Sequence, residues 1–278
     1  PEHPVDRLPP GKPVHPLAGA LRAARPAPGE PPPLWRVQFP TNPPIVTYLL
    51  VGINILVFLA DMGLRITGYG FQGVGPLTLI GAKDNQAIVR GEYWRLITPL
   101  FLHGGILHLG LNSYFLYIVG RLVERAFGTA RFLAIYLLSG IAGVVASFAF
   151  SHFDSIGASG ALFGLVGAWV PLLYRNRHVL ANTRQQIRRI VQVIAINLLI
   201  GLAPGIDNWA HLGGLVSGLA LGWFASPLYV VRVEGTAEVR LDDESSPPLV
   251  WLTISLAVPV LGGLAWLIGI LRSGTPPW

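Results

Sequence analysis

Three segments of this chain place polar side chains in apolar surroundings. His108 and Asn112 lie in one segment, Ser159 opens another, and His211 lies in a third. A polar or ionisable group at membrane depth is costly, so it indicates function by default. A serine becomes a nucleophile when a neighbouring histidine removes its proton. Hydrogen bonding between helices is the alternative use, and for Ser159 alone it would be preferred. That alternative is weaker for the other three, since these larger polar groups must share one polar pocket.

The position of Ser159 favours chemistry further. The apolar run Ser159–Tyr174 has sixteen residues, which rise about 24 Å as a helix and fall short of a bilayer core of about 30 Å. With Tyr174 at one interface, Ser159 would stand at a helix N-terminus inside the membrane. The first N–H groups of a helix are unpaired, and the helix dipole there favours negative charge. Backbone donors would therefore be at hand for an oxyanion.

Small residues indicate which helices meet. Spaced four apart, they let two backbones approach closely. If the two stripes of this chain face each other, Ser159 and His211 meet at the same end of the helix pair. The stripes are Gly160, Gly164 and Ala168 after the serine, and Gly214, Gly218 and Gly222 after the histidine.

The elements that must position these residues are membrane helices. The chain is 52% apolar and 12% charged, with mean hydropathy +0.54. Leu249–Leu271 and Phe132–Phe150 contain no Asp, Glu, Lys or Arg, and each is long enough to cross a bilayer. We therefore predict an all-α, polytopic transmembrane helical bundle. The predicted spans are Ile45–Ala60, Ile106–Val123, Phe132–Phe150, Ser159–Tyr174, Ile190–Ala203, Trp209–Ala225 and Leu249–Leu271.

The remaining segments connect or flank the spans. Residues 1–44, rich in Pro, Gly, Ala and Arg, are predicted to form a disordered cytoplasmic tail. The connection 61–105 is long enough to be partly ordered and functional. Residues 227–248 are predicted to form a charged cytoplasmic linker. No secretory signal precedes the first span, which is expected to act as its own insertion signal.

Charge predicts the orientation. With the N-terminus in the cytoplasm, fifteen Lys and Arg residues lie on that side and five on the other. This bias explains the net charge of +6 and the pI of about 10 without nucleic acid as a partner. The chain has no cysteine, which excludes disulfides and thiolate metal sites. No carboxylate joins the histidines at ligand spacing, so no metal site is indicated.

An ordered set of motifs resembles the rhomboid family of intramembrane serine proteases. The resemblance covers about residues 45–226, which would form a six-helix catalytic core, with residues 249–278 adding a seventh helix and a short tail. The matching pieces are Tyr93-Trp94-Arg95, His103 with His108-x-x-x-Asn112, Glu124-Arg125 before Gly128, Gly157-x-Ser159-Gly160, and Ala210-His211-x-x-Gly214-x-x-x-Gly218.

The resemblance implies a mechanism and a set of site residues. Ser159 would be the nucleophile and His211 the general base, in a dyad without an acid. His108 and Asn112 would help the Ser159 backbone N–H to stabilise the oxyanion, and Gly157 belongs to the same substrate-binding group. Arg95 and Glu124-Arg125 are expected to fasten loops by hydrogen bonds.

One position departs from a frequent family pattern, because Phe163 stands where a tyrosine often stacks on the histidine. A phenyl ring is still expected to pack on the imidazole.

The predicted function is cleavage of transmembrane protein substrates near the outer face of a lipid bilayer, in the inner membrane of a prokaryote. No cofactor is required, and the oligomeric state stays open. One rival is a non-catalytic rhomboid-like protein that binds client transmembrane helices, which loss of Ser159 or His211 would mark. The other is a transporter, which should show internal repeats, and no convincing repeat is found.

Overall fold

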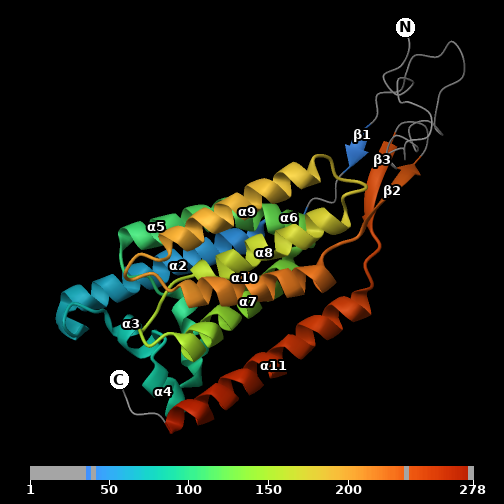
Figure 1. Ribbon diagram of the computed structural model, residues 1–278. Coiled ribbons are helices and arrows are strands. Elements are labelled where there is room, and N and C mark those ends of the chain that lie inside the picture. The colour runs from blue at the N-terminus through green and yellow to red at the C-terminus, as the bar shows by residue number, and fades with distance from the viewer. Residues whose placement is uncertain (1–35, 39–41, 235–237, 275–278) are drawn as a thin grey trace, which may run out of the picture.

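The protein is an elongated bundle of helices with a small sheet at one end (Figure 1). A computed structural model describes residues 36–38, 42–234 and 238–274. Long helices run roughly along one direction, α11 lies along the outside, and the short helices α3 and α4 lie at the end opposite the sheet. The all-α helical bundle predicted from the sequence is confirmed. The long helices are α2 (Ile45–Leu64), α5 (Ile106–Phe115), α6 (Arg121–Phe127), α7 (Thr129–Phe150), α8 (Ser159–Arg175), α9 (Thr183–Ile200), α10 (Asn208–Ala225) and α11 (Pro247–Ser273).

Each predicted span corresponds to a helix, with α5 and α6 joined by a π-helical turn into one rod, Ile106–Phe127. In the described part of the chain, four helices are long and apolar enough to cross a membrane: Ile45–Tyr69, Ile106–Phe127, Thr129–Phe150 and Pro247–Ser273. The helices α8, α9 and α10 are shorter, at 17, 18 and 18 residues. The fifth span was predicted to begin at Ile190, but α9 begins at Thr183 because its polar first turns continue the helix.

The small-residue stripes of α8 and α10 face each other, as predicted. A Cβ added to Gly214 would lie 2.0 Å from the carbonyl oxygen of Gly160, and one added to Gly218 would lie 2.0 Å from that of Gly164. A Cβ on Gly222 would lie 2.5 Å from the Cα of Ala168. No side chain fits between these backbones, so the two helices approach as closely as glycine allows. Helix α7 packs against both of them, and its Gly143 approaches the Ala210 carbonyl.

The connection after α2 is an ordered structure, as its length predicted. It contains α3 (Pro76–Gly81), α4 (Asn85–Val89) and two 3-10 turns, Tyr93–Leu96 and Thr98–Phe101. The buried Arg95 donates to the carboxylate of Glu92 at 2.7 Å and to the carbonyl oxygens of Ala82 and Leu79 at 2.8 and 3.1 Å. The prediction that Arg95 fastens this loop by hydrogen bonds is therefore confirmed.

Glu124 fastens the start of the bundle. Its carboxylate is fully buried and accepts hydrogen bonds from the N–H of Val46 at 3.0 Å and from the N–H and hydroxyl of Thr47 at 2.7 Å. The two N–H groups are first-turn donors of α2, which have no partner inside the helix. The negative charge also complements the helix dipole. The predicted structural role of Glu124 is confirmed.

A three-stranded sheet lies where the sequence analysis placed a tail and a linker. Its strands are β1 (Arg36–Gln38), β2 (Tyr229–Glu234) and β3 (Glu238–Asp243), in the order β1-β3-β2. Strand β3 pairs antiparallel with β2 and parallel with β1. The segment 227–248 is thus a folded hairpin in large part. Disorder was predicted for residues 1–44. Of these, residues 1–35 and 39–41 lie outside the described residues.

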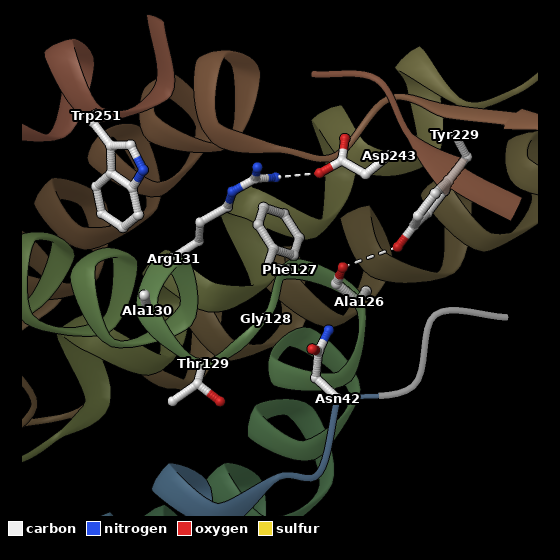
Figure 2. A pocket seen from close by; sticks show the side chains of 10 residues that line it. All are labelled: Asn42, Ala126, Phe127, Gly128, Thr129, Ala130, Arg131, Tyr229, Asp243 and Trp251. Atoms are coloured by element: carbon white, nitrogen blue, oxygen red, sulfur yellow. Dashed lines mark hydrogen bonds and ion pairs between the residues drawn. The ribbon is translucent and has the colours of Figure 1, made fainter. Parts of the chain in front are cut away.

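A cavity of about 330 Å³ lies between the α6–α7 turn, the sheet and the start of α11 (Figure 2). Across it, Arg131 of α7 donates to the carboxylate of Asp243 at 2.9 Å and to the hydroxyl of Ser245 at 3.0 Å. The hydroxyl of Tyr229 donates to the carbonyl oxygen of Ala126 at 2.9 Å. Burial would raise the pKa of Asp243, but hydrogen bonds from Ser245 and Leu228 and the Arg131 charge outweigh it and lower that pKa. These contacts attach the sheet to the bundle.

Candidate active site

Ser159 is the first residue of α8, at the end of the bundle away from the sheet (Figure 1). The opposite end of α8 meets the sheet region, where Asn176 accepts from the N–H of Tyr229 at 2.7 Å. The first backbone hydrogen bond of α8 runs from the Leu162 N–H to the Ala158 carbonyl at 3.1 Å. The N–H groups of the residues between them are therefore free of the helix's own bonds and can bind an anion.

His211 lies on the first turns of α10 and is buried. The side chain of Asp207 caps this helix by accepting from the Ala210 N–H at 3.1 Å, and it also accepts from the hydroxyl of Ser147 on α7. The cap fixes where α10 begins, and the glycine contacts fix its distance from α8. Together they bring His211 Nε2 to 2.9 Å from Ser159 Oγ. The predicted meeting of the two residues is what the fold produces.

The imidazole of His211 is held by an aromatic ring rather than by an acid. Phe163, one turn after Ser159, stacks on it with ring centroids 4.4 Å apart and planes 14° apart. The packing predicted for a phenyl at this position is confirmed. In the described part of the chain, the buried Nδ1 of His211 has no hydrogen-bond partner. The nearby Asp207 is used as a helix cap, so the arrangement is a pair and not a triad.

Gly157 and His108 lie beside this pair. Gly157 has a φ of +127°, a conformation that L-residues rarely adopt. A Cβ at this position would lie 2.8 Å from both Cε1 and Nε2 of His108 and 3.9 Å from Ser159 Oγ. The Nδ1 of His108 accepts from the Gly104 N–H at 3.4 Å, which leaves Nε2 as the ring N–H donor. This nitrogen and Ser159 Oγ both border the space beside Gly157.

Asn112 is buried one turn after His108 on α5, as the four-residue spacing predicts. Its amide donates to the carbonyl oxygen of His108 at 3.0 Å. The side chain thus braces the turn that carries His108.

Sequence reasoning missed one residue near this site. Lys83 is fully buried, and its amine donates to the carbonyl oxygen of Phe153, in the segment before Ser159, at 2.7 Å. A lysine in a long loop gives no sequence signal of burial. The ordered, partly apolar character of the 61–105 connection was the one available hint.

The fold and the site define a class: a helical membrane protein with a serine–histidine pair at the N-terminus of a bundle helix. The family model described as the Rhomboid domain matches residues 90–228, half of the chain. The chain therefore belongs to the rhomboid family, and it is an integral membrane protein.

Named relatives agree with this family. The chain is 45% identical over 181 residues to the rhomboid protease GluP of Bacillus subtilis, covering 65% of this chain and 34% of that protein. It is 43% identical over 157 residues to the mitochondrial RHOMBOID-like protein 6 of Arabidopsis thaliana, covering 55% and 51%. It is 36% identical over 180 residues to the rhomboid-type serine protease 2 of Emericella nidulans, covering 64% and 35%. The chain spans between a third and about half of the length of these relatives.

Proposed function

We propose that this protein is an intramembrane serine endopeptidase, a hydrolase that cleaves transmembrane segments of other membrane proteins with Ser159 and His211. The observation that carries the proposal is the 2.9 Å contact between Ser159 Oγ and His211 Nε2 at the N-terminus of a bundle helix. The names of the relatives in Bacillus subtilis and Emericella nidulans, a protease and a serine protease, support the same reaction.

The proposed mechanism uses Ser159 as the nucleophile and His211 as the base, and their 2.9 Å contact supports it. His211 Nε2 takes the hydroxyl proton of Ser159 as Oγ bonds to the carbonyl carbon of the substrate. The resulting imidazolium then gives this proton to the leaving amine as the peptide bond breaks. A water molecule, deprotonated by the same nitrogen, attacks the acyl-enzyme and releases Ser159. Stacking on Phe163 orients the imidazole without a carboxylate partner.

The oxyanion donors are proposed to be the Ser159 N–H and Nε2 of His108, with Asn112 supporting the latter. The support is that His108 Nε2 and Ser159 Oγ both border the space beside Gly157. Gly157 has no side chain, which leaves that space open for a substrate carbonyl. An anion there would also lie at the N-terminus of α8, where the helix dipole stabilises negative charge.

Cleavage is proposed near the outer face of a prokaryotic inner membrane, with the N-terminus in the cytoplasm. The distribution of Lys and Arg supports this orientation. The end of the bundle that carries the sheet would then be cytoplasmic, and Ser159 lies at the other end.

Substrates are proposed to be transmembrane helices that enter laterally from the bilayer and unwind before attack. An intact helix hides its carbonyl groups in hydrogen bonds, so unwinding must come first. Helix α9 supports lateral entry because it is loosely packed. It contacts the bundle chiefly through α8, and Thr183, at its first position, is the one residue of this helix that is buried.

The test is cleavage of a model transmembrane substrate by the purified full chain in proteoliposomes. Ser159→Ala, His211→Ala and the double variant should all fall to background, because neither residue works without the other. A fluorophosphonate probe should label the wild type and not Ser159→Ala. Cleavage by Ser159→Ala at the wild-type rate would overturn the proposal and favour a protein that binds client transmembrane helices. The relative in Arabidopsis thaliana is named RHOMBOID-like, without the word protease, and such a name is compatible with that function.

A further inference from the structure

The segment between α7 and α8 carries Gly157 and leads directly into Ser159. It is held by a residue from the loop after α2. The Lys83 amine donates to the carbonyl oxygens of Phe153 and Ser151, at 2.7 and 3.4 Å. The backbone of Lys83 also pairs with Ser155 in both directions, at 3.0 and 3.2 Å. The start of this segment is thus fixed to Lys83 by its side chain and by its main chain.

A neutral side chain can tie a loop of this kind equally well. Asn85, two residues further on, donates its amide to the same Ser151 carbonyl at 2.8 Å. Lys83 is nevertheless fully buried, and lysine is almost never fully buried unless a partner compensates its charge. Its hydrogen bonds go to carbonyl oxygens, so the compensation has to come from charges at longer range. The burial of a cation here requires an explanation beyond loop tethering.

Four charged groups act on Lys83, and they lie in four different parts of the chain. They are Asp84 on its own loop, Asp154 in the segment before Ser159, Asp207 at the N-cap of α10, and Arg272 at the end of α11. Burial lowers the pKa of Lys83 to about 8, although Asp207 and Asp154 act to raise it. Asp207 is the residue that fixes the start of the helix that carries His211. The amine of Lys83 therefore acts on both halves of the site, by hydrogen bonds on the serine side and by charge on the histidine side.

We propose that Lys83 is a positioning residue, whose buried ammonium sets the serine segment and the Asp207 cap of α10 in register so that Ser159 meets His211. This inference rests on the proposed proteolysis. Hydrogen bonds from an ionised donor are roughly twice as strong as neutral ones, so loss of the charge loosens the segment as well as the attraction to Asp207. In the described part of the chain Lys83 hydrogen-bonds to Ser151, Phe153 and Ser155, so it acts through the backbone that leads to Ser159.

The proposal predicts a pH dependence that a merely structural lysine would not give. As pH rises through about 8, Lys83 loses its proton and the turnover rate should fall. Stability should not fall with it. The pKa of Lys83 is lowered from the usual 10.5, so between these values the unfolded chain binds more protons than the folded one. Folding free energy linked to this group therefore becomes more favourable with rising pH. Loss of activity without loss of stability is the signature.

The experiment compares the wild type with Lys83→Met, which keeps the length of the side chain and removes the amine. Arg90→Met is the matched control, because it removes an exposed cation from the same loop. The kcat and KM for a model transmembrane substrate are measured with the full chain in proteoliposomes, from about pH 6.5 to about pH 9.5. Thermal unfolding is followed at each pH. The rate of fluorophosphonate labelling at Ser159 is measured in parallel.

We expect Lys83→Met to lower kcat by ~10–100-fold with KM within ~2-fold, since misplacing a reacting group by about 1 Å costs up to ~10². The decline above about pH 8 should be present in the wild type and in Arg90→Met and absent in Lys83→Met. Unchanged kcat and an unchanged pH profile in Lys83→Met would overturn the proposal.

If Lys83→Met does not fold, labelling of the wild type decides. A labelling rate that stays constant to about pH 9.5, or one that falls only together with the melting temperature, overturns the proposal. A wild type that neither cleaves nor labels would instead overturn the proposed proteolysis.

Discussion

Replacing Gly157 with alanine should disable the site while leaving most of the protein folded. The φ of +127° strains any L-residue, at a cost of about 1–3 kcal/mol. The new Cβ would also lie 2.8 Å from Cε1 and Nε2 of His108, where ordinary contact begins at 3.4 Å. The His108 ring must therefore move away from the space beside Ser159. Losing one oxyanion donor typically costs ~10²–10³ in rate, so we expect kcat to fall by about that factor.

The matched control is Gly91→Ala. Gly91 also has a positive φ, +100°, but no heavy atom lies within 4 Å of its added Cβ. It should show the loss of stability without the loss of kcat. The assay is cleavage of a model transmembrane substrate together with thermal unfolding. Should Gly157→Ala lose stability yet turn over at the wild-type rate, the assignment of His108 as an oxyanion donor would be refuted.

Three further predictions address packing, anchoring and topology. Gly218→Ala places a Cβ 2.0 Å from the Gly164 carbonyl oxygen. It should lower activity, and it should lower the free energy of unfolding by ~1–3 kcal/mol, as measured by cleavage and thermal unfolding. The control Gly263→Ala, with open space around the added Cβ, should change neither. Glu124→Gln weakens buried bonds to the start of α2 and should cost ~1–3 kcal/mol in thermal unfolding, with kcat of the folded enzyme unchanged; equal stability would count against the anchoring role. A cysteine at Asn182, alone in a chain without cysteine, should react with impermeant reagents from the cytoplasmic side, and labelling from outside would reverse the topology.

The helix bundle and the serine–histidine contact were predictable because their sequence patterns are local, and because a polar side chain at membrane depth is energetically costly. Polar groups such as His211 stand out in apolar runs, and small residues at every fourth position of α8 and α10 indicate which faces can approach. The 2.9 Å contact between Ser159 and His211 follows from these two patterns taken together. The direction of the Asn112 amide did not follow, because a spacing of four residues fixes the helix face and not the rotamer.

The sheet was not predicted for a different reason. Strand β1 has three residues, and it pairs with β3, about two hundred residues later in the chain. The pattern of either segment alone is that of a polar connection. Lys83 escaped notice on similar grounds, since its burial arises from the 151–158 segment that folds over it. In both cases the structure depends on a contact between segments far apart in the chain. Neither segment has an apolar period that would predict the contact.

The position of the sheet has a consequence for biosynthesis. Strand β1 precedes the first membrane helix and β3 precedes the last, so pairing them joins the beginning of the bundle to its final helix. Because a nascent chain emerges N-terminus first, β1 has no partner strand until residues 238–243 have been synthesised. By then all the described helices that precede β3 have been synthesised. The sheet therefore forms only after the helices of the core have been synthesised. A chain stalled before β3 would expose the unpaired β1 strand to quality-control proteases.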